Sequence, residues 1–72
     1  MQEYNVALNW DEEAQVWLAQ NDEIPIALES GSLDALIERI KVAVPELLGL
    51  NADNQKKNIR LHFKAERLAL VA

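Results

Sequence analysis

Residues 32–50, SLDALIERIKVAVPELLGL, have the clearest hydrophobic pattern in the chain. Their apolar side chains recur at steps of three and four, which is the spacing of one face of an α-helix. These side chains are Leu33, Leu36, Ile37, Ile40, Val44, Leu47 and Leu48. Ser32 suits the cap at the start of this helix, and Gly49 suits the left-handed position that ends it. Pro45 removes one backbone donor, so we expect a kink or a new helical turn there.

Residues 3–10, EYNVALNW, follow a period of two instead. One side of this stretch carries Tyr4, Val6, Leu8 and Trp10, and the other side is mostly polar. Such alternation predicts a strand with one buried face. Residues 11–14 are polar and few, which is typical of a hairpin turn.

Residues 15–19, QVWLA, form the second predicted strand and are rich in strand formers. The length of the turn decides which of their side chains face the core. A four-residue turn would pair Trp10 with Gln15 and direct Trp17 and Ala19 inward. A five-residue turn would direct the alternate side chains inward. We favour the first arrangement.

Two further extended segments are expected. The third strand covers residues 24–29 and opens with Ile24-Pro25, a dipeptide that favours extended backbone at a sheet edge. The fourth covers residues 59–64, where apolar and charged residues alternate. Residues 51–58 are polar and predict a loop. Residues 68–71, LALV, either continue the fourth strand past a bulge or form a short fifth strand.

The order of elements is therefore β-β-β-α-β, in a single α+β domain that spans residues 1–72. We expect one mainly antiparallel sheet of four strands with the helix packed on one face. Because the helix joins the third strand to the fourth, the fourth strand fits best beside the first, in the order 3-2-1-4. One helix leaves the second face of the sheet uncovered, and such a face is available for docking.

Charge is distributed unevenly along the chain, whose net charge is −5. Residues 1–31 contain seven acidic residues and no Lys or Arg, whereas residues 32–72 contain five acidic and seven basic residues. An acidic half repels a phosphate backbone and attracts a basic protein.

Length and composition narrow the class of protein further. A chain of 72 residues has a small core, which favours a homodimer or another partner. There is no cysteine, so disulfides and thiolate metal sites are excluded. The chain has no basic leader and no apolar run of membrane-spanning length, so we expect a cytoplasmic protein.

Three segments together resemble the HicB-like antitoxin superfamily, and within it a small family of unknown function. Residues 10–19, WDEEAQVWLA, resemble the first hairpin of that family, and Ile24-Pro25 resembles the opening of its third strand. Residues 32–48 resemble its helix, including the internal Pro45. The resemblance covers residues 4–50 well and implies a partial RNase H-like fold.

In HicB proteins this domain binds and masks HicA, a small basic toxin that cleaves messenger RNA. The resemblance therefore implies a non-catalytic, prokaryotic protein-binding module, either an antitoxin or an orphan of the same fold, with a small basic HicA-like toxin as partner. The chain departs from the family at Ile26, where a glycine is usual. It also ends at Ala72 without the DNA-binding segment common in HicB antitoxins, so we do not expect it to repress an operon alone.

Acidic residues are the first candidates for a binding surface. They are Asp11, Glu12, Glu13, Asp22 and Glu23. A surface of this charge would cover the basic face of a toxin. The three consecutive acids at 11–13 point in different directions, so they are unsuited to one metal ion.

The fourth predicted strand gives a second candidate surface, for nucleic acid or another subunit. Its polar side carries Arg60, His62 and Lys64, with Lys56, Lys57 and Arg67 nearby in sequence. Clustered cations favour nucleic-acid binding. No aromatic residue is interleaved among them to stack on bases, and Glu3 of the first strand would lie alongside.

No pattern in the chain predicts an enzyme. RNase H chemistry needs carboxylates on neighbouring strands around two metal ions, whereas the inward positions here are apolar. The single histidine, His62, has no orienting acid that the sequence can place. We therefore expect no catalytic residue, metal or cofactor. The apolar end of the chain makes Leu68 and Leu70 candidates for an edge strand that pairs across a dimer axis.

Overall fold

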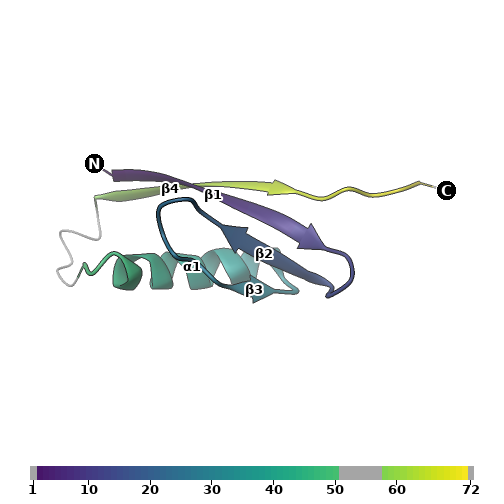
Figure 1. Ribbon diagram of the computed structural model, residues 1–72, viewed down its shortest axis with the longest axis horizontal. Coiled ribbons are helices and arrows are strands. Elements are labelled where there is room, and N and C mark those ends of the chain that lie inside the picture. Colours follow the sequence, from purple (N-terminus) through teal and green to yellow (C-terminus); the bar gives the residue numbers. More distant parts are fainter. Residues whose placement is uncertain (1, 51–57, 72) are drawn as a thin grey trace.

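The computed structural model describes residues 2–50 and 58–71. Its elements are β1 (Gln2–Asp11), β2 (Val16–Gln20), β3 (Glu29–Ser30), α1 (Leu33–Leu47) and β4 (Ile59–Glu66) (Figure 1). The four strands form one mixed sheet in the order β3-β2-β1-β4. β1 pairs antiparallel with β2 and parallel with β4. The predicted α+β class, element order and strand order are confirmed.

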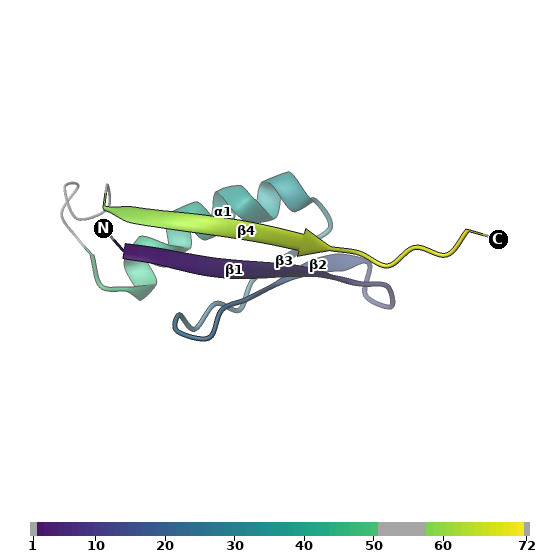
Figure 2. The ribbon, with the colours of Figure 1, turned by 90° about the horizontal axis from the view of Figure 1, so that it is seen from above.

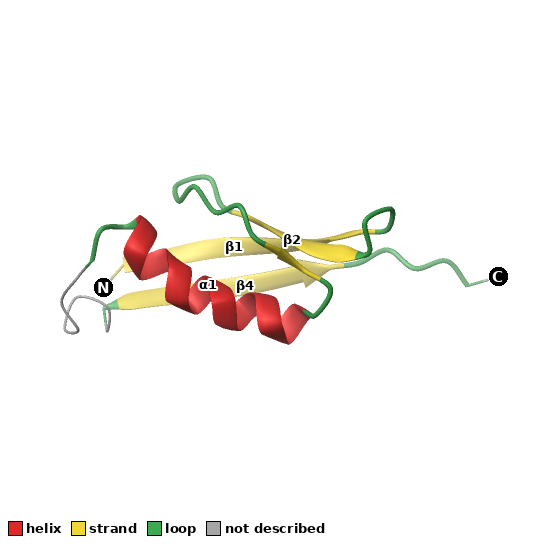
Figure 3. Cartoon of the chain, turned by 90° about the horizontal axis from the view of Figure 1, so that it is seen from below, coloured by secondary structure: helices red, strands yellow, loops and turns green. Residues whose placement is uncertain are grey.

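The helix covers one face of the sheet. β1 and β4 lie in front of α1 in Figure 2, and α1 lies in front of the strands when the molecule is seen from the opposite side in Figure 3. The buried side chains of the core lie between these two layers. They are Val6, Leu8, Ala19, Ile24, Leu36, Ile40 and Val44. Within the described residues, no helix is long and apolar enough to cross a membrane.

Both predicted ends of the helix are confirmed. The Ser32 hydroxyl accepts a hydrogen bond from the N–H of Ala35 at 3.3 Å, which satisfies one of the free donors of the first turn. Gly49 has a φ of +72°, which suits a residue without a side chain. The N–H groups of Gly49 and Leu50 donate to carbonyls of the last turn at 3.0 and 2.9 Å. This pair of bonds closes the helix as a Schellman motif.

The helix continues through Pro45 and ends two residues later at Leu47. Pro45 has no N–H, so the carbonyl of Lys41 loses its helical donor. No new helix begins there. The proline lies in the last turn of the helix and removes one helical bond.

Leu47 is the one stripe position that the pattern misplaces. Its side chain is 43% exposed, whereas Leu36, Ile40 and Val44 are fully buried. Leu47 is the last residue of the helix and lies beyond the last buried position. The prediction that it faces the core is therefore wrong, and Leu48 makes the apolar contact at this end.

The first hairpin keeps the predicted faces but not the predicted register. Ala19 is buried and Trp17 packs partly on the core, as expected. However, Ala19 lies opposite Leu8, and Trp17 lies opposite Trp10. The turn has four residues, as predicted, but it begins one residue later, at residue 12. Moving a turn along by one residue shifts the pairing by two residues, and each side chain therefore stays on its face.

The third strand is much shorter than predicted, with only Glu29 and Ser30 in the sheet. The N–H of Ile26 donates to the carbonyl of Ile24 at 2.7 Å, in a tight turn centred on Pro25. This bond uses a donor that a longer strand would need for pairing with β2. The segment nevertheless contributes to the core through the buried side chain of Ile24.

The end of the described chain also differs from the prediction. β4 runs to Glu66, two residues further than expected, and residues 67–71 belong to no strand. They continue past the end of β4 (Figure 1), and residues 67–70 border a hollow together with Trp10 and Glu12. Leu68, Leu70 and Val71 are 84%, 91% and 99% exposed. Neither a bulged continuation nor a fifth strand forms within one chain. The predicted loop at 51–58 lies, except for Asn58, outside the described residues.

Candidate partner-binding surfaces

The turn between β1 and β2 holds three of the predicted acidic residues, and two of them shape the turn itself. Asp11 Oδ1 accepts the N–H groups of Glu13 and Ala14 at 3.1 and 3.2 Å. The Glu12 carboxylate accepts the indole N–H of Trp10 at 2.5 Å. The Gln15 backbone closes the turn at a φ of +58°. Asp11 and Glu12 therefore fix the turn, while Glu13 points its charge outward as an exposed side chain.

The structure does not bring the five predicted acidic residues together. Asp22 and Glu23 follow β2, whereas the hairpin turn precedes it. A strand of five residues separates the two sites by about 17 Å. The Asn21 side chain holds the second site: its oxygen accepts the N–H groups of Glu23 and Ile24, both at 2.7 Å, and its nitrogen donates to the Asn5 carbonyl at 2.6 Å.

Other carboxylates join the hairpin turn instead. The turn lies at the same end of the molecule as the start of α1 and the end of β4 (Figure 1). A Cβ built on Gly31, just before α1, would be 3.6 Å from the carbonyl of Gln15. We call this region the hairpin end. Its exposed carboxylates are those of Glu12, Glu13, Asp34 and Glu66. Asp34 and Glu66 were not predicted as members of this surface, and Glu66 lies beyond the predicted end of the fourth strand at residue 64.

The predicted basic residues lie together on the sheet face opposite the helix. Arg60, His62 and Lys64 alternate along β4, and the register places Glu3 of β1 beside Arg60, as predicted. The carboxylate of Glu3 is 3.1 Å from Arg60 Nη1 and 3.7 Å from His62 Nε2. The carboxylate of Glu3 therefore lies next to two of the three basic side chains. Lys56 and Lys57 lie outside the described residues.

Arg67 is separate from that basic row. Its guanidinium carbon lies 4.0 Å from the centroid of the Trp10 ring. Trp10 in turn meets Trp17 edge-to-face, with ring centroids 5.5 Å apart and planes inclined at 64°. The two tryptophans and this arginine join the end of β4 to the hairpin. Such a cluster stabilises the hairpin end.

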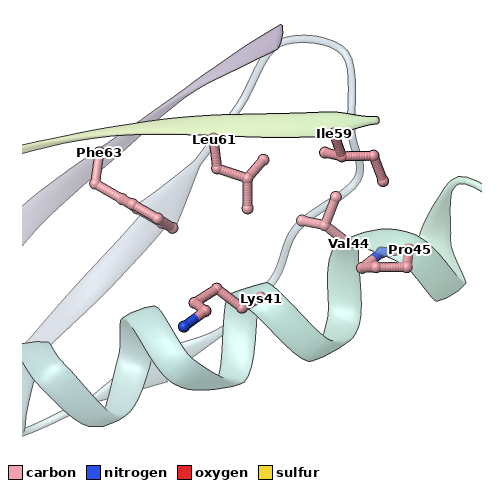
Figure 4. Close-up of a pocket in the computed structure, with 6 residues that line it drawn as sticks. All are labelled: Lys41, Val44, Pro45, Ile59, Leu61 and Phe63. Carbon is pink, nitrogen blue, oxygen red and sulfur yellow. The ribbon is translucent and has the colours of Figure 1, made fainter. Parts of the chain in front are cut away.

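A groove opens between α1 and β4 and has a volume of about 310 Å³. Figure 4 shows the side chains of Ile59, Leu61 and Phe63 directed from β4 toward the helix, with Val44, Pro45 and Lys41 opposite them. Five of these six side chains are apolar. The groove could not be predicted from the sequence, because the alternation in β4 indicates only which side chains point inward.

The described surfaces differ in charge and polarity. In the part of the chain that the structure describes, no group of three His, Asp or Glu side chains is arranged to hold a metal ion. The groove carries one ammonium group, that of Lys41, and no carboxylate, hydroxyl or imidazole. The described surfaces thus comprise an acidic hairpin end, a partly neutralised basic row and an apolar groove.

The fold and surfaces define a small α+β domain with one open sheet face, and the comparisons with known proteins agree with it. Residues 3–71 match the family described as a domain of unknown function, DUF1902, and the chain belongs to that family. No curated protein matches the sequence.

A crystal structure of similar architecture is that of hypothetical protein TTHA1013 from the extremely thermophilic bacterium Thermus thermophilus. The two chains share 34% identity over 97% of this chain and 100% of that one, with a TM-score of 0.76. The predicted membership of a small family of unknown function is confirmed, while the relation to HicB antitoxins stays a prediction.

Proposed function

We propose that this protein is a non-catalytic protein-binding module of the HicB-like kind, which masks a small basic RNA-cleaving toxin. The observation that carries this proposal is the hairpin end, where the hairpin turn, the first turn of α1 and the last residue of β4 each carry an exposed carboxylate. The Asp11 side chain fixes the backbone of the turn, and the contact of Arg67 with Trp10 joins the end of β1 to the residue after β4. A rigid acidic surface is suited to a basic partner because little conformational freedom is lost on binding.

Masking requires only that the hairpin end cover the RNA-binding face of the toxin. Opposite charges speed the encounter and disfavour neutral or acidic competitors. The basic face of the toxin would bind either RNA or the acidic hairpin end, because both are negatively charged. The two would therefore compete for the same face. The antitoxin role needs no catalytic group on this chain.

The test is binding to a HicA-like toxin supplied separately, or to a small basic protein if the adjacent gene encodes one. Glu13→Lys is the informative variant, because Glu13 is exposed at the hairpin end. Glu23→Lys is its matched control, because it makes the same change of charge at the distant site beyond β2. We expect Glu13→Lys to weaken binding and slow association more than Glu23→Lys. Equal effects of both variants, or no binding by the wild type, would contradict the proposal.

A nucleic-acid-binding regulator is the alternative function. It is favoured by the exposed row of Arg60, His62 and Lys64 on one edge strand. The carboxylate of Glu3 between two of these groups weakens the attraction to phosphate. If this face binds RNA or DNA, Glu3→Gln tightens a gel shift at low salt, and added salt abolishes it steeply. Glu29→Gln removes the same charge away from β4 and is the control.

A further inference from the structure

Strand β4 and residues 67–71 form one continuous extended segment with an open edge. β4 is the outermost strand of the sheet, bonded to β1 on one side only. The segment contains no proline, and its last apolar side chains are almost fully exposed. An unprotected edge with this composition is a template for pairing with another chain.

The backbone direction shows which residues present this edge. The carbonyl of Asn58 accepts the N–H of Gln2 at 2.8 Å, so even-numbered residues of β4 direct their N–H and C=O groups to β1. In a parallel strand, the backbone N–H and C=O groups of successive residues are directed alternately to the two neighbouring sides of the sheet. The odd-numbered residues, from Ile59 to Ala65, therefore direct their donors and acceptors to the open edge.

We propose that a second copy of this chain pairs there, in an antiparallel homodimer whose two-fold axis passes beside Ala65. The two four-stranded sheets then join into one of eight strands, with residues 67–71 of each copy along β4 of the other. Residues 67–71 continue the chain past the end of β4, so they cannot lie along their own β4 edge (Figure 1). On a second copy, the open edge of β4 offers backbone donors and acceptors with which residues 67–71 can pair. This dimer does not depend on the masking of a basic partner.

Charge selects the register. A two-fold axis beside Lys64 or Glu66 would place that residue opposite itself, and like charges directly opposite one another are unfavourable. An axis beside Phe63 would leave most of residues 68–71 beyond the partner's β4. With the axis beside Ala65, each Lys64 lies opposite Glu66 of the partner subunit, so the dimer gains two ion pairs.

The same register arranges the apolar side chains. On the face toward the helix, Ile59 lies opposite Val71 of the partner subunit, and Leu61 lies opposite Ala69 of the partner subunit. Ile59 and Leu61 line the groove beside α1 (Figure 4). The added strand therefore extends the apolar surface that borders the groove. On the other face, Leu68 lies opposite His62 of the partner subunit, and Leu70 lies opposite Arg60 of the partner subunit.

Cysteine cross-linking tests the axis directly, because the chain has no cysteine of its own. At an Ala65-centred axis the two Ala65 Cα atoms are about 5.5 Å apart, within the roughly 4.4–6.8 Å that a disulfide spans. We expect Ala65→Cys to form a covalent dimer under mild oxidation. Ala14→Cys, on the exposed hairpin turn, is the control and should stay monomeric. Equal cross-linking of the two variants would overturn the proposal.

A charge swap tests the register. We expect Lys64→Glu and Glu66→Lys each to raise the dimer dissociation constant about tenfold, because each creates two like-charge pairs. The double variant restores the pairs in reverse and should recover the wild-type value. Sedimentation velocity measures the constants, and circular dichroism confirms that each variant is folded. A wild type that is monomeric at every concentration, or a double variant as weak as the single ones, would overturn the proposal.

Ala65→Pro separates dimerisation from folding. The N–H of Ala65 points to the open edge, so its removal costs no bond to β1. We expect this variant to remain folded and become monomeric. Lys64→Pro is the contrast, since it removes a donor to β1 and should lower the stability of the fold itself. A folded Ala65→Pro variant that still dimerises with wild-type affinity would contradict the arrangement.

Discussion

The guanidinium of Arg67 stacks on the ring of Trp10, with its central carbon 4.0 Å from the ring centroid. This contact joins the first residue after β4 to the end of β1, which the sequence separates by more than fifty residues. It also fixes where residues 68–71 leave the sheet.

Loss of the Arg67 charge should loosen this end of the molecule. We expect Arg67→Gln to lower the free energy of unfolding by about 0.5–1 kcal/mol, the usual value of an exposed cation–π contact. Urea denaturation followed by tryptophan fluorescence measures the change. Lys41→Gln is the control, because it also removes one positive charge, and the ion pair of Lys41 with Glu38 on the helix is exposed. Equal effects of both variants would contradict a specific contact.

The two sides of α1 should differ strongly in their tolerance of alanine. Ile40 is fully buried, so Ile40→Ala should cost about 2–5 kcal/mol. A domain of this size has only about 3–5 kcal/mol of stability, so the variant should be largely unfolded. Val42 on the same helix is 67% exposed, and Val42→Ala should change stability by less than about 0.5 kcal/mol. Thermal melts of both variants measure the contrast, and similar melting temperatures would contradict this packing.

The two glycines should respond in opposite directions to alanine. Gly49 ends the helix at a φ of +72°, where a Cβ costs about 1–2 kcal/mol. Gly31 has no such φ, and a Cβ there would meet the Gln15 carbonyl at an ordinary 3.6 Å. We therefore expect Gly49→Ala to lower the free energy of unfolding and Gly31→Ala to raise it slightly, by up to about 1 kcal/mol. Chemical denaturation measures the free energy of unfolding of both variants. A change of the same sign in both would contradict the prediction.

Pro45 should be a net cost to the fold. Pro45→Ala returns a donor to the carbonyl of Lys41, and we expect a gain of about 1–3 kcal/mol, less than or equal to the full helix-interior difference. Glu46→Ala in the same turn is the control and should have little effect. Denaturation midpoints measure both. A loss of stability in Pro45→Ala would mean that packing of the proline in the groove outweighs its backbone cost.

Much of this fold follows from periodicity alone. The alternation around Val6 and Leu8 placed β1, and the spacing of Leu36, Ile40 and Val44 placed the helix, because each pattern records a face that must be buried. The strand order followed from the crossover through the helix. These features depend on which side chains are apolar, and the apolar positions are known from the sequence.

Other features depend on local backbone geometry, which periodicity does not record. The hairpin register shifted because Asp11 bonds the N–H groups of Glu13 and Ala14, so the turn starts one residue later. β3 is short because the Ile26 N–H is used within a tight turn.

The candidate surfaces were only partly predictable from the sequence for a related reason. The contact between Glu3 and Arg60 follows from the strand order, and it was predicted. The separation of Asp22 and Glu23 from the hairpin end depends on where β2 begins and ends, and this separation was not predicted.

The central position of β1 has a consequence for how the chain folds. Its two neighbours in the sheet are β2, which follows it immediately, and β4, which is made last among the described strands. During synthesis, β1 can form its hairpin early, but its other edge stays bare until residues 59–66 emerge. Pairings between distant segments form slowly, and bare edges attract other chains in the meantime. The nascent protein is therefore most vulnerable to aggregation in the interval between the end of α1 and the arrival of β4.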